Sequence, residues 1–416
     1  MAQSFFMDNE KILKKLFEQK LKIHQLENFT DPENARSIRI KYIQARSKLT
    51  LSEINKTHLQ ADTLINKNIE NFIGSVEIPI GIAGPIKIIG TYAKGEFFIP
   101  LATTEGALVA STSRGATASF VSGIKTICEY HGITRAPLFR IKSITEVEKV
   151  TNWLFNNLDE LKTIAITVDP FIKLKNYQLY YLGRSLWIRF FFDTDRAMGM
   201  NMATNAASVL AEFIAEKLDI SLIAVSGNLC IDKKASILHK ISPRGRTVSA
   251  EAIISREIVA KVLKTTPEAM VEVNIRKTWQ GSSLAGSISH NAHTANIIAA
   301  IFAATGQDLA HVVDSSISDT VMEMDGEDLY VTIKIPSLII GTLGGGTHIS
   351  KQSEAIKLML TDISGKINNT EHLSEQFAEI IAATVLSGEI SLHAAIAAGQ
   401  LAQAHQQLGQ AKKIKP

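Results

Sequence analysis

The sequence predicts an α+β protein in which a large, mostly helical domain surrounds a central helix and a small α/β domain is inserted into it. Hydrophobic patterns between residues 137 and 224 follow the order strand, helix, strand, strand, helix, strand, which is the split βαβ order of a ferredoxin-like sandwich. Alanine-rich helices in residues 225–408 surround one apolar strand pair, DLYVTIKIP and SLIIGTLGGG. The length of 416 residues also exceeds what one small core can organise.

A helical region is expected at the N-terminus, in residues 1–65. Apolar residues recur at helical spacing between residues 8 and 25, behind Asp8, which is a suitable N-cap. The large domain would then comprise residues 66–136 and 225–408, the inserted domain residues 137–224, and the C-terminal tail residues 409–416.

Two segments lead from the N-terminal region into the inserted domain. Residues 76–90, VEIPIGIAGPIKIIG, predict short strands joined by a turn at Ala83, Gly84 and Pro85. Residues 103–130 are rich in Ala, Ser, Thr and Gly, which predicts a buried helix that ends at Gly132. Within the inserted domain we expect strands at 138–141, 163–168 and 221–225, helices at 145–158 and 202–218, and a long strand, or a hairpin broken at Gly183, at 177–192.

Composition and charge narrow the class of protein. Lys and Arg number 44 against 41 Asp and Glu, so the net charge of +3 creates no strong field for nucleic acid or membrane. The two cysteines, Cys128 and Cys230, form neither a disulfide framework nor a metal-ligand spacing, and suit a reducing compartment. Since the first residues lack the pattern of a signal peptide and no long uninterrupted apolar stretch occurs, we expect a cytoplasmic protein.

Four ionisable residues stand out, although each also has an ordinary structural explanation. Glu105 heads the small-residue helix, where it could act as a general acid or simply complement the helix dipole. Lys233, in SGNLCIDKK, could polarise a carbonyl or belong to a surface lysine pair. Asp308 of GQD could orient a lysine or make a turn. His405 could protonate a leaving group or be structural.

Two glycine-rich segments are candidates for a dinucleotide site. They are DRAMGMNM at residues 195–202, which leads into a predicted helix, and GTLGGGT at residues 341–347. Exposed N–H groups at a helix start can hold a pyrophosphate. Neither segment has the GxGxxG spacing with the flanking strand and helix of a Rossmann fold. A dinucleotide would therefore bind to a domain of another fold.

The order and wording of these motifs resemble one family. ENFIG at residues 70–74, PIGIAGP, TTEGALVASTSRG, AMGMNM, VSGNLCIDKK, GQD and GTLGGGT occur in unbroken order between about Ile69 and His405. They are similar to 3-hydroxy-3-methylglutaryl-CoA (HMG-CoA) reductases of class I, the class shared by eukaryotes and archaea. The resemblance implies an enzyme of the mevalonate pathway that reduces HMG-CoA to mevalonate and CoA with two NADPH, in a soluble form.

The resemblance also implies a role for each catalytic candidate. Lys233 would polarise the thioester carbonyl and stabilise the oxyanion, and Glu105 would supply a proton to the developing alcohol. Asp308 would lie between them and tune both, while His405 would protonate the departing CoA thiolate. No metal is required for this chemistry.

Further residues are implied to bind the substrate and cofactor. The family forms a tight homodimer, or a higher oligomer of dimers, with ENFIG at the contact. The hydroxymethylglutaryl group would be surrounded by Arg135, Ser226, Asp232, Lys234, Lys277 and Asn296, and CoA would lie near His293 and Arg114. The dinucleotide would be held by Met198, Gly199, Met200 and Asn201 and by Gly344, Gly345, Gly346 and Thr347.

The cofactor motif departs from the family at one position. The family has Asp-Ala-Met-Gly where this chain has Arg196 before Ala197, with the acid displaced to Asp195. The stretch that binds the 2′-phosphate in animal enzymes has no clear equivalent, and Lys173 or Lys175 could replace it. NADPH is therefore expected from the class, and NADH stays open.

Three alternative functions also stay open. The first is an NADH-linked relative that runs in the mevalonate-degrading direction. The second is an inactive CoA-binding scaffold, although no catalytic residue of the family is missing. The third is an ordinary Rossmann dehydrogenase, for which the sequence lacks the fingerprint.

Overall fold

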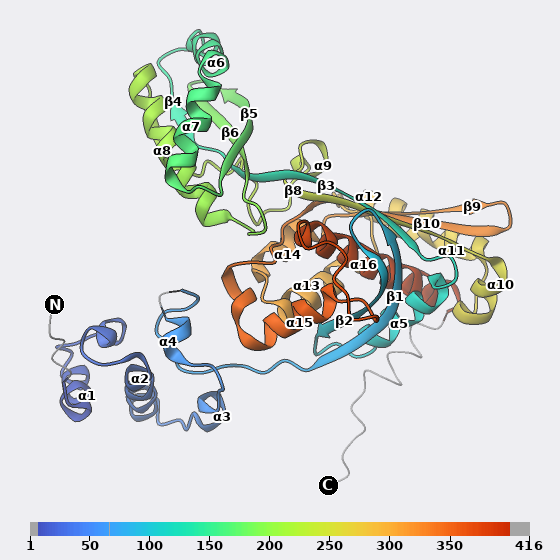
Figure 1. Cartoon of the computed structure of the whole chain (residues 1–416), viewed down its shortest axis with the longest axis horizontal. Helices are drawn as coiled ribbons and strands as arrows, with labels where there is room; N and C mark the ends of the chain where they lie inside the picture. The colour runs from blue at the N-terminus through green and yellow to red at the C-terminus, as the bar shows by residue number, and fades with distance from the viewer. Residues whose placement is uncertain (1–6, 66, 400–416) are drawn as a thin grey trace. The chain divides into compact units, whose positions relative to one another are not determined.

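The structure is a computed structural model that describes residues 7–65 and 67–399. The chain divides into two compact units, with the boundary between Pro79 and Ile80. Figure 1 shows the helices and strands of both units. The predicted tail at 409–416 lies outside the described residues, as does the candidate His405.

The first unit is helical and has a small core of its own. Asp8 caps its first helix by accepting a hydrogen bond from the Glu10 N–H, as predicted. The helix expected over residues 8–25 is shorter, because Gln19 adopts a left-handed conformation (φ 57°) that ends it. The elements are α1 Asn9–Phe17, η1 Ile23–Asn28, α2 Pro32–Ser47, α3 Ser52–Asn55 and α4 Ala61–Leu64.

The elements between residues 138 and 224 form a four-stranded antiparallel sheet in the order β7-β4-β6-β5. Two stretches of helix follow β4, and one helix connects β6 to β7. These elements enclose a separate hydrophobic core that includes Phe139, Leu154, Phe190 and Leu210. Their bounds are β4 Leu138–Arg140, α6 Glu146–Asn156, α7 Leu158–Val168, β5 Lys173–Leu182, β6 Ser185–Asp193, α8 Met200–Leu218 and β7 Ser221–Ala224.

One predicted strand in this region is wrong. Residues 163–168 continue helix α7, in which Leu161 and Ala165 are buried four residues apart while Ile166 is exposed. That spacing follows the helical period, whereas a strand would bury alternate residues. The second strand is instead β5, and it forms a hairpin with β6 at Gly183.

Six strands form the sheet of the large region, in the order β2-β1-β3-β8-β10-β9. The pair β1 and β3 is parallel, and all other neighbours are antiparallel. The end of β3 also pairs with β6, so this strand continues from the large sheet into the small one. The strands are β1 Ile80–Gly90, β2 Lys94–Ala102, β3 Ile124–Arg135, β8 Gly245–Ile254, β9 Asp319–Asp325 and β10 Asp328–Leu338.

The large region therefore contains more strand than the sequence suggested. The helix predicted over residues 103–130 is limited to α5, Leu108–Ser119, because burial alternates from Ile124 onward as in a strand. The expected turn at residues 83–85 is an irregularity within β1. DLYVTIKIP and SLIIGTLGGG do not form the predicted strand pair. The first two residues of SLIIGTLGGG are the end of β10, and β10 pairs with β8 and β9.

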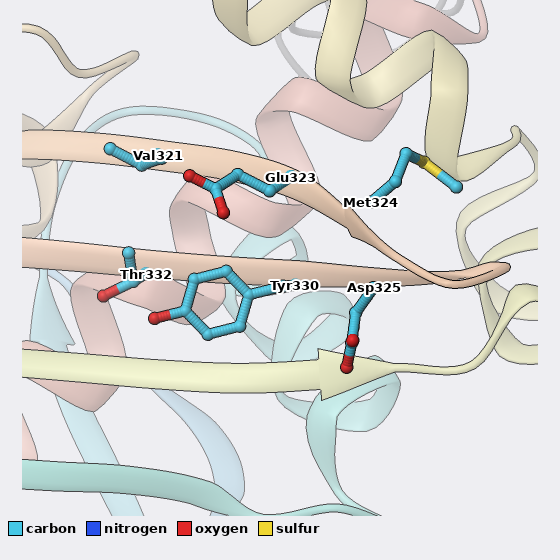
Figure 2. A pocket seen from close by; sticks show the side chains of 6 residues that line it. All are labelled: Val321, Glu323, Met324, Asp325, Tyr330 and Thr332. Carbon is cyan, nitrogen blue, oxygen red and sulfur yellow. The ribbon is translucent and has the colours of Figure 1, made fainter.

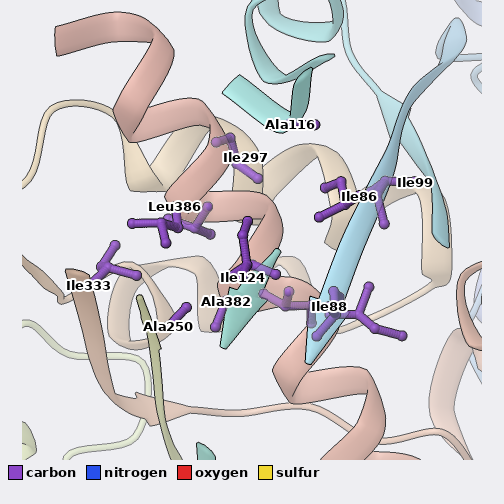
Figure 3. Close-up of a cluster of buried hydrophobic side chains, with 14 of the residues drawn as sticks. Ile86, Ile88, Ile99, Ala116, Ile124, Ala250, Ile297, Ile333, Ala382 and Leu386 are labelled. Carbon is purple, nitrogen blue, oxygen red and sulfur yellow. The ribbon is translucent and has the colours of Figure 1, made fainter. Parts of the chain in front are cut away.

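The central helix is α16, Leu373–Ala397, and nearly all of its side chains are buried. Figure 3 shows Ala382 and Leu386 of this helix within the large hydrophobic cluster. Among the described helices, α16 is the one long and apolar enough to span a membrane, but its burial is that of a core helix. The remaining helices are α9 Leu238–Ile241, α10 Arg256–Ile258, η2 Val259–Leu263, α11 Pro267–Val273, η3 Asn274–Gly281, α12 Ser282–Leu284, α13 Thr294–Thr305, η4 Leu309–His311, α14 Val312–Ser315, η5 Gly345–His348 and α15 Ser350–Leu360.

Candidate active site

The loop that follows β7 holds Lys233 in an uncommon backbone conformation. Three of its non-glycine residues have left-handed φ angles: Asn228 (67°), Ile231 (54°) and Lys233 (56°). Such conformations cost roughly 1–3 kcal/mol each and concentrate at functional sites. The strain marks this loop as a candidate site independently of its sequence motif.

Lys233 forms an ion pair with Asp308. The Nζ atom of Lys233 lies 2.7 Å from Oδ2 of Asp308, and both side chains remain more than a third exposed. Burial by itself raises the pKa of the Asp308 carboxyl, but hydrogen bonds from Lys233 and from the Ala310 N–H, together with the charge of His311, lower it below its usual value. The pair therefore presents an ammonium group, held by an ionised carboxylate, to solvent or to a substrate.

A second cluster surrounds Asp232. Arg244 Nη2 lies 3.0 Å from Asp232 Oδ1, and Arg135 Nη1 lies 3.6 Å from Asp232 Oδ2. Arg135 also donates to Thr204 Oγ1 (2.8 Å) and to Ser226 Oγ (3.5 Å). The structure thus brings together three residues that the sequence placed in one site, namely Arg135, Ser226 and Asp232.

Glu105 pairs with a different partner. It lies between β2 and α5, is exposed, and accepts a hydrogen bond of 3.1 Å from Asn296 Nδ2 on α13. Within the described residues, no hydrogen bond or ion pair connects Glu105 to Lys233 or Asp308. The candidate acid and the candidate carbonyl-polarising group are therefore held by separate partners.

The two glycine-rich segments lie against each other. The Thr342 N–H donates to Arg196 O (2.9 Å), and Ala197 and Leu343 form a parallel bridge. A Cβ at Gly341 would lie 2.4 Å from the Met198 nitrogen, so this approach requires glycine. Gly199 is the N-cap residue of α8 and has no side chain to cap the helix, so within the described part of the chain no side-chain cap competes with an anion at its first N–H groups. These features fit the phosphates of a dinucleotide.

The loop of Asp308 rests on the same glycine-rich segment. A Cβ at Gly306 would lie 2.4 Å from Gly346 O. The Gln307 side chain accepts a hydrogen bond from the Gly341 N–H and donates one to the Gly341 carbonyl, both at 3.0 Å. The candidate cofactor loops and the Lys233–Asp308 pair are therefore joined by direct backbone contact.

The remaining candidates have further partners or are exposed. Arg114 donates to the carbonyl (2.6 Å) and hydroxyl (3.0 Å) of Ser391. His293 precedes α13, with its N–H bound to Glu389. Lys234 donates to Asp232 O (3.3 Å), and Lys277 is exposed on η3. Of the lysines near the cofactor motif, Lys175 donates to Tyr130 O (2.8 Å) and Lys173 is exposed at the start of β5, while Arg196 pairs with Asp195 at 3.8 Å.

Sequence reasoning missed three buried residues of this site. Arg244, His311 and Asp314 are almost completely buried around Asp232 and Lys233. A signal existed, since His311 and Asp314 follow Asp308 at steps of three residues on a helical turn. Asp232, His311 and Asp314 could in principle surround a metal ion, but the charges of Arg244, Arg135 and Lys233 oppose a divalent cation there.

A pocket of about 550 Å³ lies elsewhere, on the hairpin of β9 and β10. Figure 2 shows its lining, which includes Glu323, Asp325 and Tyr330. None of the candidate site residues lines it. Its two carboxylates would repel an anionic ligand such as CoA.

Comparison with known proteins places the chain in one family. The sequence profile described as hydroxymethylglutaryl-coenzyme A reductase matches residues 35–410. The 3-hydroxy-3-methylglutaryl-coenzyme A reductase of Pyrococcus abyssi is 46% identical over 97% of this chain and 100% of its own length. Reductase 2 of Dictyostelium discoideum is 42% identical over 86% of this chain and 68% of its own.

A solved structure supports the same fold. It is a class II 3-hydroxy-3-methylglutaryl-CoA reductase from Streptococcus pneumoniae bound to NADPH, with a TM-score of 0.65 at 16% identity over 94% of this chain and 97% of the other. The family match and the archaeal relative both extend over most of the chain. The chain belongs to the hydroxymethylglutaryl-coenzyme A reductase family of oxidoreductases.

Proposed function

We propose that this chain is a class I-type reductase that converts (S)-HMG-CoA to (R)-mevalonate and CoA with two NADPH. The chain is more similar in sequence to archaeal and amoebal reductases than to a bacterial class II enzyme, which supports the assignment to class I. The observation that carries the proposed site is the Lys233–Asp308 ion pair beside two interlocked glycine-rich loops. The net reaction adds two hydrides and two protons to the thioester and releases a thiol.

Lys233 is the group that stabilises negative charge on oxygen. The bound nicotinamide supplies hydride to the thioester carbon. The carbonyl oxygen then becomes an alkoxide, and an ammonium already held by Asp308 needs no reorganisation to stabilise it. The same group serves again when the aldehyde is reduced to the alcohol.

Glu105 and His405 move the protons in this proposal. Glu105, oriented by Asn296, protonates the developing alcohol. His405 lies outside the described residues and is assigned to protonate the CoA thiolate as the C–S bond of the hemithioacetal breaks. Asp308 keeps Lys233 charged throughout.

The Asp232 cluster binds the hydroxymethylglutaryl group. Arg135 is oriented by Thr204, Ser226 and Asp232, which prepares its guanidinium for the free carboxylate of the substrate. Asn296 faces the same group through its contact with Glu105. Lys234 and Lys277 complete this set, and His293 and Arg114 are assigned to CoA.

The cofactor is assigned to the small four-stranded region and the glycine-rich loops. Met198, Gly199, Met200 and Asn201 would hold the dinucleotide together with the loop from Gly344 to Thr347, on an inserted domain at residues 137–224 that resembles ferredoxin-like folds rather than a Rossmann fold. Arg196, Lys173 and Lys175 are the cations available for a 2′-phosphate.

The ratio of kcat/KM for NADPH and NADH tests the cofactor assignment. We expect at least a tenfold preference for NADPH, equivalent to about 1.4 kcal/mol. Replacing Arg196, Lys173 and Lys175 together by Gln should reduce that preference while the rate with NADH is retained. A clear preference for NADH in the wild-type protein would instead favour the mevalonate-degrading relative.

Replacement of Lys233 by Met tests the proposed catalytic site. We expect kcat to fall about 10²- to 10³-fold, as for the loss of an oxyanion-stabilising donor, with circular dichroism unchanged. Lys261→Met is the matched control, since Lys261 is exposed on η2 and has no assigned role. Near-normal turnover by Lys233→Met would remove Lys233 from the mechanism.

We also propose a cytoplasmic homodimer. The first strand supports the dimer, since Ile80 and Ile82 of β1 are 56% and 50% exposed on one face. Val76 and Ile78, at the end of the first unit, are also exposed, at 84% and 47%.

A further inference from the structure

His311 and Asp314 form a buried pair directly behind the proposed catalytic ion pair. The His311 Nδ1 atom lies 3.1 Å from both carboxylate oxygens of Asp314. Both side chains are almost completely buried. Asp314 Oδ2 also accepts a hydrogen bond of 3.3 Å from the backbone N–H of Lys233. One buried carboxylate therefore holds both the imidazole and the strained loop of Lys233.

The other ring nitrogen of His311 faces two more carboxylates. Its Nε2 atom lies 3.6 Å from Asp232 Oδ1 and 3.9 Å from Asp308 Oδ2. It is buried and has no hydrogen-bond partner within the described residues. Nε2 is therefore the ring atom through which His311 acts on Asp232 and Asp308, and a positive charge on the ring favours the ionised form of all three acids.

The remaining charges around the imidazole come from several elements. Lys233 faces it from the loop after β7, and Arg244, in the segment before β8, shares Asp232 Oδ1 with it. The buried His239 of α9 lies near Asp314 and bonds to the Lys234 carbonyl (2.8 Å). Arg135 on β3 also pairs with Asp232 Oδ2 at 3.6 Å, so the three acids Asp232, Asp308 and Asp314 face the three cations Lys233, Arg244 and Arg135, with the His311 ring among them.

We propose that His311 and Asp314 are a positioning dyad for the reduction, rather than residues that touch the substrate. His311 lies against the Asp308 carboxylate and Asp314 holds the backbone of Lys233, so the Lys233–Asp308 ion pair stays in place and the Lys233 side chain stays aimed at the substrate oxygen. The charge of His311 is among the causes that lower the pKa of the Asp308 carboxyl. This inference rests on the proposed function, in which Lys233 and Asp308 serve catalysis.

The pH dependence of kcat distinguishes this role from simple packing. In His311→Gln, Asp308 loses a nearby positive charge, so its pKa rises and the acid limb of the kcat profile moves to higher pH by about one unit. Asp308 stays ionised at neutral pH, so the fall in kcat that we expect there, about tenfold with the KM for HMG-CoA within about threefold, reports the lost positioning of Lys233. Asp314→Asn removes the acceptor of the Lys233 N–H rather than a positive charge, so it should lower kcat at neutral pH without moving the acid limb to higher pH.

A surface pair provides the control. His372 lies 3.8 Å from Glu375 at the same spacing of three residues, but it is half exposed and has no assigned role. His372→Gln should leave both kcat and its pH profile unchanged. An unshifted profile in folded His311→Gln, or a normal kcat in folded Asp314→Asn, would overturn the proposal.

A double-mutant cycle gives a second readout. If the dyad acts through Asp308, His311→Gln should cost little further activity in an Asp308→Asn background. Fully additive losses, or failure of both dyad variants to fold, would assign the pair to stability alone and overturn the proposal. If the wild-type protein does not reduce HMG-CoA, the proposed function itself is refuted. That result is distinguishable from failure of the dyad proposal, which is measured on variants of an active protein.

Discussion

Asp232 shows how single residues couple binding and stability in this fold. Burial by itself raises the pKa of the Asp232 carboxyl, but the charges of Arg244, His311 and Arg135 lower it below its usual value. Because the folded pKa is below the unfolded value of about 3.9, the ionised carboxylate stabilises the fold above that pH. This contribution is lost as the pH falls through the folded pKa.

We expect Asp232→Asn to lower the free energy of unfolding by about 3 kcal/mol near pH 7, because the fully buried Arg244 loses its counter-charge. The difference from wild type should shrink below about pH 4, where the wild-type carboxylate also becomes protonated. Guanidinium titrations at both pH values measure it. Asp219→Asn, which disrupts an exposed pair with Lys142, should have little effect at either pH, and an equal effect of the two variants would contradict the argument.

At the same scale, sequence reasoning found the residues proposed to bind a ligand more readily than the buried residues that hold them in place. Arg135, Ser226 and Asp232 could be grouped because motifs name them, and the structure places them together. Arg244 could not be grouped with them, because no motif or spacing connects it to Asp232. The spacing of Asp314 connects it to Asp308, but its contact with the Lys233 loop, 81 residues away in sequence, is visible only in the structure. Burial of a charged residue is visible only once the fold is known.

At the scale of elements, the contact between α5 and α16 depends on one glycine. A Cβ at Gly115 would lie 1.7 Å from Ser387 O, and a backbone carbonyl in a buried helix cannot move aside. We expect Gly115→Ala to destabilise the fold by more than about 3 kcal/mol. Gly281→Ala is the control, because the nearest atom to its Cβ is 3.6 Å away and alanine favours helix, so it should stabilise by about 0.5–1 kcal/mol. Thermal melting measures both, and a harmless Gly115→Ala would refute the close packing.

The same elements explain which secondary structure the sequence could reveal. Small residues in TTEGALVASTSRG correctly indicated a buried helix, and Gly115 is the reason they are needed. The continuation to residue 130 was wrong because small residues alone do not distinguish a helix from a strand buried beneath another element. The burial alternation of Ile124, Thr126 and their exposed neighbours comes from pairing with β8.

At the scale of the whole molecule, the exposed apolar row on β1 bears on assembly. We expect the protein to sediment as a dimer, and Ile80→Asp with Ile82→Asp to shift it towards the monomer, because charges on this face would be buried without partners. Light scattering coupled to gel filtration measures the mass. Leu182→Asp, at a similarly exposed site beside the β5–β6 turn, should leave the mass unchanged. A dimer that withstands both β1 substitutions would exclude this face from the interface.

The contact of Gly306 with Gly346 has a consequence for redesign of the enzyme. No side chain separates these two backbones, and Gln307 fixes the adjoining Gly341 from both sides. Insertions in residues 341–347, or bulky replacements of Gly341 or Gly346, would therefore be transmitted to Asp308. Variants designed to change the preference between NADPH and NADH should therefore replace Arg196, Lys173 and Lys175, the cations proposed for the 2′-phosphate, and leave the length of that loop unchanged.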